Sequence, residues 1–207
     1  MAGAHRGREV WLAAAVTKLR PFFSSHGFEI SDALRVSCGW PSVGGTAPGK
    51  RRIGEAWSST SSRDKHFEIF ISPALDKPAE VLAVLVHELV HVAVGLECGH
   101  KGRFPMYARS VGLEGRMTAT YPSDPLRERL NDLAGKLGKY PHGSLDGMTN
   151  GRKKQKARLI RASCLTCTYT IRAAMTWLLI AVPTCPNPDC HSFGKAFDIA
   201  FPEDEDG

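Results

Sequence analysis

Two histidines and a glutamate stand in a pattern that can hold and use a metal ion. His87, Glu88 and His91 belong to the sequence HELVH, in which the histidines lie four positions apart. On a helix those positions share one face, so both imidazoles can bind one ion while the glutamate stands beside its open side. Zinc held in this way polarises a scissile carbonyl, and Glu88 moves a proton from water to the leaving amine. The pattern predicts metal-assisted hydrolysis, with His87 and His91 as metal ligands and Glu88 as the general base.

A catalytic zinc ion needs a third protein ligand and an open fourth position. His100 is the strongest candidate, because Gly95 and Gly99 allow the chain to turn back under the helix. Glu97 and Glu114 are the alternatives. The competing interpretation is that the histidines are satisfied core residues. It is disfavoured, because an otherwise apolar helix would then bury unpaired polar groups.

Four cysteines form a second group with the spacing of metal ligands. Cys164 and Cys167 are separated by two residues, Cys185 and Cys190 by four, and seventeen residues lie between the pairs. Thiolates at this spacing can share one tetrahedral zinc ion, as in a zinc ribbon. His191 is an alternative to Cys190 as the fourth ligand. We therefore expect two zinc ions, one catalytic and one structural.

The helix that carries HELVH must run through the centre of a domain. Residues 81–94 are strongly apolar, Pro78 stands near the expected start and Gly95 at the expected end. The other elements follow from hydrophobic periodicity and turn residues. We expect further helices at 9–24, 103–111 and 124–137, and strands at 34–36, 53–57 and 66–72. These elements predict an α+β fold in which the HExxH helix packs on a small sheet.

Length and composition indicate one main domain with a small appendage. The 207 residues are 43% hydrophobic and 23% charged, which allows a core without disulfides. The sequence has no run of about 18 apolar residues, so we expect no membrane span. We expect a catalytic domain at 1–140, a linker at 141–151 and a β-rich cysteine module with an acidic tail at 152–207. The absence of a recognisable leader favours a cytoplasmic protein.

The net charge of +6 is concentrated before and within the cysteine module. From Arg152 to Arg172 the chain has seven basic residues and no acidic one. Such a stretch can follow a phosphate backbone, which makes DNA a candidate partner, or it can be a solvated linker. Trp177 could stack on a base, but we expect it to fill the small core, with residues 169–179 forming a hairpin.

The sequence HELVH at 87–91, GHKGRF at 99–104 and Gly112-Leu113 together resemble the SprT-like zinc metallopeptidases, which include the Spartan DNA-dependent proteases. The resemblance is close over 87–113 and loose over 9–137. It implies a zincin-like fold, with His87, His91 and His100 as zinc ligands and Glu88 as the general base. It also implies a C-terminal zinc ribbon, protein substrates associated with DNA, and a role in DNA–protein crosslink repair.

Two other functions use some of the same residues. A nucleic-acid-binding adaptor could retain the HExxH site as a structural or vestigial metal site. A deformylase-like amidase also has HExxH, but it needs a metal-binding cysteine on an upstream strand, and the surroundings of Cys38 fit that poorly. Tyr107, Arg109, Arg116 and Tyr121 are candidates for stabilising an oxyanion.

Overall fold

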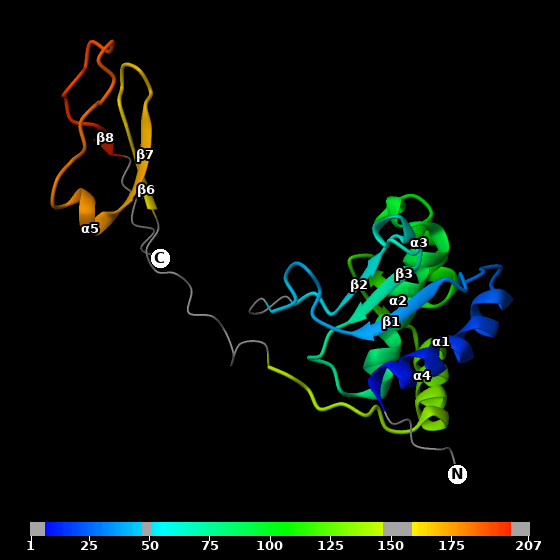
Figure 1. The fold of residues 1–207 in the computed structure, drawn as a ribbon. Coiled ribbons are helices and arrows are strands. Elements are labelled where there is room, and N and C mark those ends of the chain that lie inside the picture. Colours follow the sequence, from blue (N-terminus) through cyan, green and yellow to red (C-terminus); the bar gives the residue numbers. More distant parts are fainter. Residues whose placement is uncertain (1–6, 47–50, 147–158, 200–207) are drawn as a thin grey trace. The chain divides into compact units, whose positions relative to one another are not determined.

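The chain divides into two compact units, which we call unit 1 (Met1–Asn150) and unit 2 (Gly151–Gly207). The structure is a computed structural model that describes residues 7–46, 51–146 and 159–199 (Figure 1). The division between the units falls within the predicted linker at 141–151. Both units combine helices with small sheets, so the predicted α+β class is confirmed. None of the described helices is long and apolar enough to cross a membrane.

A mixed three-stranded sheet forms one layer of unit 1. Strand β3 (Phe67–Ile71) lies in the middle, parallel to β1 (Leu34–Cys38) and antiparallel to β2 (Gly54–Trp57). Alternation along β3 buries Ile69 and Ile71 completely on the core side. Because β3 is the middle strand, β2 lies at an edge of the sheet. It contacts the helix that carries HELVH.

That helix, α2 (Pro78–Val94), is the central element of unit 1. It contacts β2 and β3 on one side and α4 (Asp124–Leu137) on another (Figure 1). Eleven of its seventeen residues are buried, which explains its continuous apolar sequence. Proline occupies its first turn, where no backbone N–H is needed, and Gly95 ends it with φ 93°.

The remaining helices close the core around α2. Helix α1 (Arg8–Ser25) packs on β1 and α4, and the short α3 (Phe104–Ser110) packs on α2. The indole N–H of Trp11 donates a 3.1 Å hydrogen bond to the Gly138 carbonyl oxygen, and its ring lies edge-on to the buried ring of Tyr140. The N-terminal helix is therefore fastened to the segment that follows α4.

The segment after Tyr140 remains attached to unit 1 at the start of the predicted linker. The Ser144 hydroxyl donates to the Ala74 carbonyl oxygen at 2.8 Å, and the Leu145 N–H donates to the Pro73 carbonyl oxygen at 2.8 Å. The rest of that predicted linker, and most of the basic stretch that follows it, lie outside the described residues.

Three short elements of unit 1 have no counterpart in the sequence-based prediction. An antiparallel hairpin joins β4 (Leu113–Arg116) and β5 (Ala119–Pro122). Single 3-10 turns occur at η1 (Ser59–Ser61) and η2 (Leu96–Cys98). The hairpin and η2 matter for the site, because one supplies a partner to His87 and the other leads into His100.

Unit 2 is a small antiparallel sheet with a loop-rich cap. Strand β6 (Leu159–Ser163) pairs with β7 (Thr170–Ala174) on one side and β8 (Asp198–Ile199) on the other. Instead of the expected hairpin strand, the chain after β7 forms the one-turn helix α5 (Met175–Leu178). Leu178 of this helix is buried, and Trp177 is 68% exposed, so the prediction that Trp177 fills the core was wrong.

Candidate metal centres

Three histidines of unit 1 bring their ring nitrogens to one point. His87 and His91 extend from the same face of α2, as their spacing predicts, and His100 approaches from the loop after η2. The Nε2 atom of His100 lies 3.2 Å from Nε2 of His87 and 3.3 Å from Nε2 of His91. These ligand atoms all lie within 4.8 Å of one another, so the group could hold a metal ion.

The loop between α2 and His100 is shaped by glycines and fixed by the end of the helix. Gly95 and Gly99 have φ of 93° and 50°, a region that residues with a Cβ rarely adopt. The Arg103 guanidinium donates a 2.9 Å hydrogen bond to the Val94 carbonyl oxygen, which lacks a partner within the helix at this end. These contacts hold the returning chain against α2.

The imidazoles are in the form that binds metals. Burial lowers the pKa of His87 to about 4 and that of His91 to about 3, with smaller effects from neighbouring histidines. Burial also lowers the pKa of His100, followed by the effect of Arg52. At neutral pH all three rings are uncharged, and a neutral imidazole offers a lone pair to a cation. Three such nitrogens on one point match the protein ligands of a catalytic zinc site with an open position.

A threonine and a phenylalanine orient the histidine rings. The Thr120 hydroxyl on β5 lies 2.8 Å from Nδ1 of His87, which leaves the Nε2 atom of that ring directed at the other histidines. The ring of Phe104 stacks on His91, with centroids 4.2 Å apart and planes 29° from parallel. A hydrogen bond to the second nitrogen of a ligand histidine fixes its tautomer and ring orientation. The sequence offered no signal for Thr120, because the hairpin that carries it was not predicted.

Glu88 lies beside the three imidazoles but outside their group. Its side chain is buried, and burial raises the pKa of its carboxyl to about 8 despite the opposing charge of Arg52 and a hydrogen bond from the Ala56 backbone. A Cβ added to Gly54 would lie 2.4 Å from the carboxyl oxygen Oε1 of Glu88. The edge strand β2 can therefore pass this close to the carboxyl only because it has a glycine there.

The alternative ligands from the sequence lie elsewhere. Among the described residues, the histidine group includes neither Glu97 nor Glu114, and both glutamates are exposed. The thiol of Cys98 lies 3.7 Å from the Val94 carbonyl oxygen rather than among the histidines. Of the candidates for the third ligand, the structure brings His100 to the other two.

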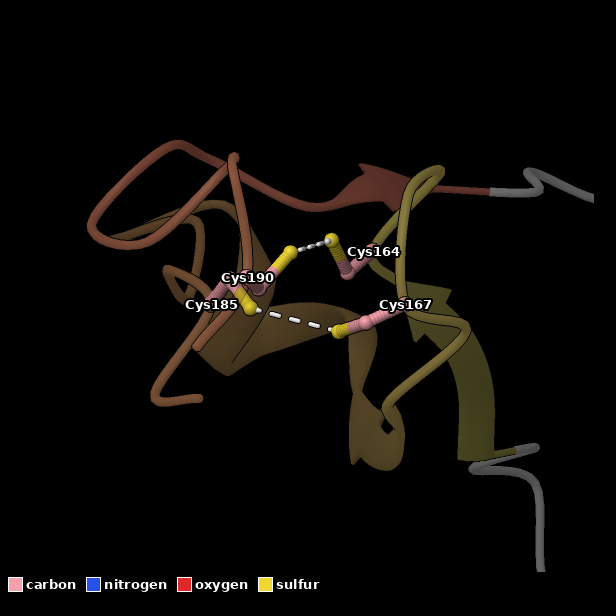
Figure 2. A group of neighbouring side chains, drawn as sticks. All are labelled: Cys164, Cys167, Cys185 and Cys190. Carbon is pink, nitrogen blue, oxygen red and sulfur yellow. Dashed lines mark hydrogen bonds between the residues drawn. The ribbon is translucent and has the colours of Figure 1, made fainter. Parts of the chain in front are cut away.

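The four predicted cysteines of unit 2 form a second group. Figure 2 shows the pair Cys164 and Cys167 facing the pair Cys185 and Cys190. The Sγ atoms of Cys167 and Cys185 are 3.5 Å apart, and those of Cys164 and Cys190 are 3.8 Å apart. These distances exceed a disulfide bond of about 2.05 Å. They resemble the roughly 3.8 Å between sulfurs that each lie about 2.3 Å from one tetrahedral zinc ion.

Backbone N–H groups donate to two of the four sulfurs. Those of Cys167 and Thr166 point at the sulfur of Cys164 and lower its pKa to about 6. The Ser192 N–H donates to the sulfur of Cys190 at 3.3 Å. Burial raises the pKa of Cys185, and a bound cation would favour its thiolate, which is the metal-binding form of cysteine. The four sulfurs together fit a metal ion such as zinc. The alternative ligand His191 is exposed, and the structure directs Cys190 into the group.

Comparison with known proteins gives no relative for this chain. No protein-family model matches it. Neither curated proteins nor solved structures show a significant similarity to it. The two ligand groups and their surroundings are therefore the basis for assigning a function.

Proposed function

We propose that this chain is a zinc-dependent endopeptidase of the SprT-like type, with a zincin-like catalytic domain in unit 1. The observation that carries the proposal is the convergence of three neutral imidazoles next to a buried glutamate. The HExxH helix lies against a small mixed sheet whose edge strand β2 contacts Glu88. This arrangement suits hydrolysis, because a base and three metal ligands share one site.

Zinc bound by His87, His91 and His100 would supply positive charge that polarises a scissile carbonyl and favours the ionised form of the Glu88 carboxyl. The Glu88 carboxylate accepts a proton from a water molecule whose oxygen attaches to the carbonyl carbon. The same carboxyl then gives this proton to the amide nitrogen as the carbon–nitrogen bond breaks. The first products are a carboxylic acid, which keeps the second hydrogen of the water, and an amine. Transfer of that hydrogen as a proton gives a carboxylate and an ammonium group, and Glu88 returns to its ionised state.

Unit 2 supports the choice of DNA-associated proteins as the substrate class. Arg161 on β6 lies directly opposite Arg172 on β7, and both side chains are exposed. Within the described part of unit 2, no acidic side chain forms an ion pair with either arginine. Like charges opposite one another in a sheet are unfavourable, and a bound phosphate would relieve their repulsion. We propose that unit 2 is a structural zinc ribbon that binds nucleic acid through this face.

Comparison of Glu88→Gln with the wild-type chain tests the peptidase activity. Both proteins are incubated with a basic protein bound to DNA, with and without added single-stranded DNA. We expect about two zinc ions per chain in each protein, and a loss of cleavage of about 10²- to 10⁴-fold in the variant. Glu80→Gln is the matched control, because Glu80 lies on the same helix but is exposed and pairs with Lys77. Undiminished cleavage by Glu88→Gln would contradict the mechanism.

A nucleic-acid-binding adaptor is the second candidate function, and the opposed pair Arg161 and Arg172 is the observation that favours it. An adaptor would bind DNA with an affinity that falls as salt rises, and exchanging either arginine for glutamine would weaken it. It would show no cleavage that depends on Glu88. The same incubation therefore separates the two functions.

A further inference from the structure

The first part of the predicted linker lies along the loop that joins β3 to α2. We call this segment, residues 141–146, the strap. Ser144 and Leu145 donate hydrogen bonds to carbonyl oxygens of the loop, and the strap is exposed from Gly143 onwards. Because so little apolar surface is buried there, polar contacts hold the strap on unit 1.

His142 connects the strap to two other segments of unit 1. Its Nε2 atom lies 2.8 Å from the Pro73 carbonyl oxygen in the loop, and its Nδ1 atom lies 3.3 Å from Nη1 of Arg8 at the start of α1. A carbonyl oxygen only accepts a hydrogen bond, so Nε2 must carry the hydrogen. A guanidinium only donates, so Nδ1 must offer its lone pair. Both contacts therefore require a neutral imidazole with its hydrogen on Nε2.

Protonation of this ring replaces an attraction with a repulsion. The added hydrogen lies on Nδ1 and faces the N–H groups of Arg8, so that one donor meets another. The ring also gains a positive charge beside the guanidinium, and like charges at this distance repel. Both nitrogens belong to one rigid ring, so a movement of Nδ1 away from Arg8 also moves Nε2 away from Pro73.

Other ionisable side chains adjoin these contacts on the same segments. Those with partners are Glu9 beside Arg8, Asp76 on the Ser144 N–H, Lys77 with Glu80, and Asp146 with Arg51. Lys139 is exposed to solvent, and Tyr140 stays uncharged because burial raises the pKa of its hydroxyl. Among the described residues, Arg8 is the charged side chain within hydrogen-bond distance of the ring. Its repulsion therefore decides how the strap responds to protonation.

The chain that precedes the strap is held independently of His142. Tyr140 is fully buried, and the Trp11 indole N–H donates to the Gly138 carbonyl oxygen. In the strap itself the remaining hydrogen bonds are exposed to water and individually weak. Loss of the His142 contacts should therefore free the strap but leave α4 in place. The connection between the units would then gain six residues, or roughly 20 Å when extended.

We propose that His142 makes the strap a pH-sensitive latch. The neutral ring fastens the start of the linker to unit 1, and protonation releases it, so that unit 2 has a longer connection to unit 1. Because the docked strap excludes a proton that the released strap accepts, a falling pH favours release. This device goes beyond the proposed peptidase function, since it requires neither zinc nor cleavage.

NMR of the full chain between about pH 8 and pH 5.5, the range in which histidines titrate, tests the latch. At the higher pH the ring nitrogens of His142 should show the hydrogen on Nε2. The order parameters of the Ser144 and Leu145 amides should fall from about 0.85 to below about 0.6 as the pH is lowered. Their midpoint should coincide with that of the His142 ring resonances. Order parameters that stay constant while the ring titrates would overturn the proposal.

Arg8→Gln tests the source of the repulsion. A glutamine amide can donate to Nδ1 of the neutral ring and, after turning over, can accept from Nδ1 of the charged ring. We therefore expect the strap of Arg8→Gln to remain ordered at the lower pH. Lys18→Gln is the matched control, because it removes the same charge from an exposed position of α1 and should release as the wild-type chain does. Equal release in Arg8→Gln and the wild-type chain would contradict the latch.

His142→Gln provides a side chain that can donate and accept but does not titrate in this range. Its strap should have the same order parameters at both pH values. His66→Gln is the control, since His66 contacts Asp64 and should leave the response of the strap unchanged. A fall in His142→Gln as large as in the wild-type chain would assign the release to another group and overturn the role of His142. None of these measurements depends on turnover, so undiminished cleavage by Glu88→Gln would overturn the peptidase mechanism and leave the latch intact.

Discussion

The histidine group and the cysteine group lie in cores of different size. Two of the three histidines lie on a helix that is part of a core of 28 buried apolar residues, counted over the described part of unit 1. The described core of unit 2 has seven buried members, and three of these are the ligands Cys164, Cys185 and Cys190. In unit 1 the ligands lie on a fold with its own core, whereas in unit 2 they form much of the core.

This difference predicts that a metal ion would contribute differently to the folding of the two units. A core the size of that in unit 1 can supply the stability of a domain, so folding there does not require a metal ion. A module as small as unit 2 needs a metal ion or disulfides to remain folded, and its thiols are free. Removing a cysteine ligand should therefore unfold unit 2, whereas removing a histidine ligand should abolish activity without unfolding unit 1.

Loss of a cysteine ligand should have the largest effect on structure. Cys167→Ser is expected to lose one zinc ion and to unfold unit 2, because structural zinc contributes about 10–16 kcal/mol of apparent binding free energy in small modules. Unit 1 should remain folded. Zinc analysis and an amide correlation NMR spectrum measure both results. Cys98→Ser, which replaces a half-buried thiol in unit 1, is the control and should retain both ions. Dispersed unit 2 resonances in Cys167→Ser would show that the module folds without the ion.

Loss of a histidine ligand should remove the metal without unfolding unit 1. His100→Ala is expected to bind one zinc ion instead of two. With both proteins free of metal, the free energy of unfolding of unit 1 should differ from that of the wild-type chain by less than about 1 kcal/mol. Chemical denaturation and zinc analysis provide these quantities. His66→Ala is the matched control, because Nδ1 of His66 lies 3.0 Å from the Asp64 backbone oxygen and 3.5 Å from the Asp64 carboxylate, outside the histidine group. If His100→Ala unfolds unit 1, the contrast between the two units is wrong.

Sequence patterns were sufficient where the determining contacts are local. The apolar run 81–94 fixed the central helix, and the spacing within HELVH placed His87 and His91 on one face. The cysteine spacing identified the second group in the same way. The β4–β5 hairpin was missed, because each of its strands has only four residues and few of them are buried. The burial of Trp177 was predicted wrongly, because the alternation expected of a strand does not apply in the one-turn helix α5. In that helix Leu178 is buried and Trp177 is exposed.

The parts of the site that were not predicted depend on contacts between distant segments. Thr120 reaches His87 from a hairpin 33 residues later in the sequence. Gly54 reaches Glu88 from an edge strand whose position depends on its pairing with β3. A threonine and a glycine are common residue types, and nothing in their local sequence distinguishes them. Their roles follow from the packing of the sheet on α2.

The hydrogen bond from β5 offers a milder test of how unit 1 prepares its site. Thr120→Val keeps the shape of the side chain but removes the partner of His87 Nδ1. We expect the zinc affinity of the histidine group to fall by about 10- to 100-fold, with no change at the cysteine group. Competition with a zinc-binding dye measures both sites. Thr118→Val, an exchange at an exposed position of the same hairpin, should leave both affinities unaltered.

The close passage of β2 over Glu88 should be sensitive to a single methyl group. In Gly54→Ala the new Cβ would lie 2.4 Å from Oε1 of Glu88 and 2.5 Å from Cγ1 of Val84, so one of them must move. We expect a loss of about 1–3 kcal/mol in the free energy of unfolding, and reduced cleavage. Gly135→Ala is the control, since this helical glycine has open space around it and its exchange should stabilise α4 by about 0.5–1 kcal/mol. Equal stability of Gly54→Ala and the wild-type chain would mean that the strand is free to shift.

The smallest expected effect concerns the opposed arginines of unit 2. Arg161→Glu replaces a like-charge pair with an ion pair to Arg172, which should stabilise unit 2 by about 0.2–1 kcal/mol in low salt. The same exchange should weaken binding to single-stranded DNA, because it removes a phosphate contact and adds a repulsive charge. A gain in stability together with a loss of binding would show that the arginines are kept opposed for a ligand rather than for the fold.

Lys195→Glu separates this pairing from the effect of net charge. Lys195 is exposed on unit 2, and its exchange changes the charge of the chain by the same amount without placing a carboxylate opposite Arg172. Thermal unfolding of zinc-loaded unit 2, followed by NMR at low and high salt, should show a gain in Arg161→Glu alone, and added salt should reduce it. Equal gains in both variants would show that the effect comes from overall charge. The opposed arginines would then no longer support the proposal that unit 2 binds nucleic acid.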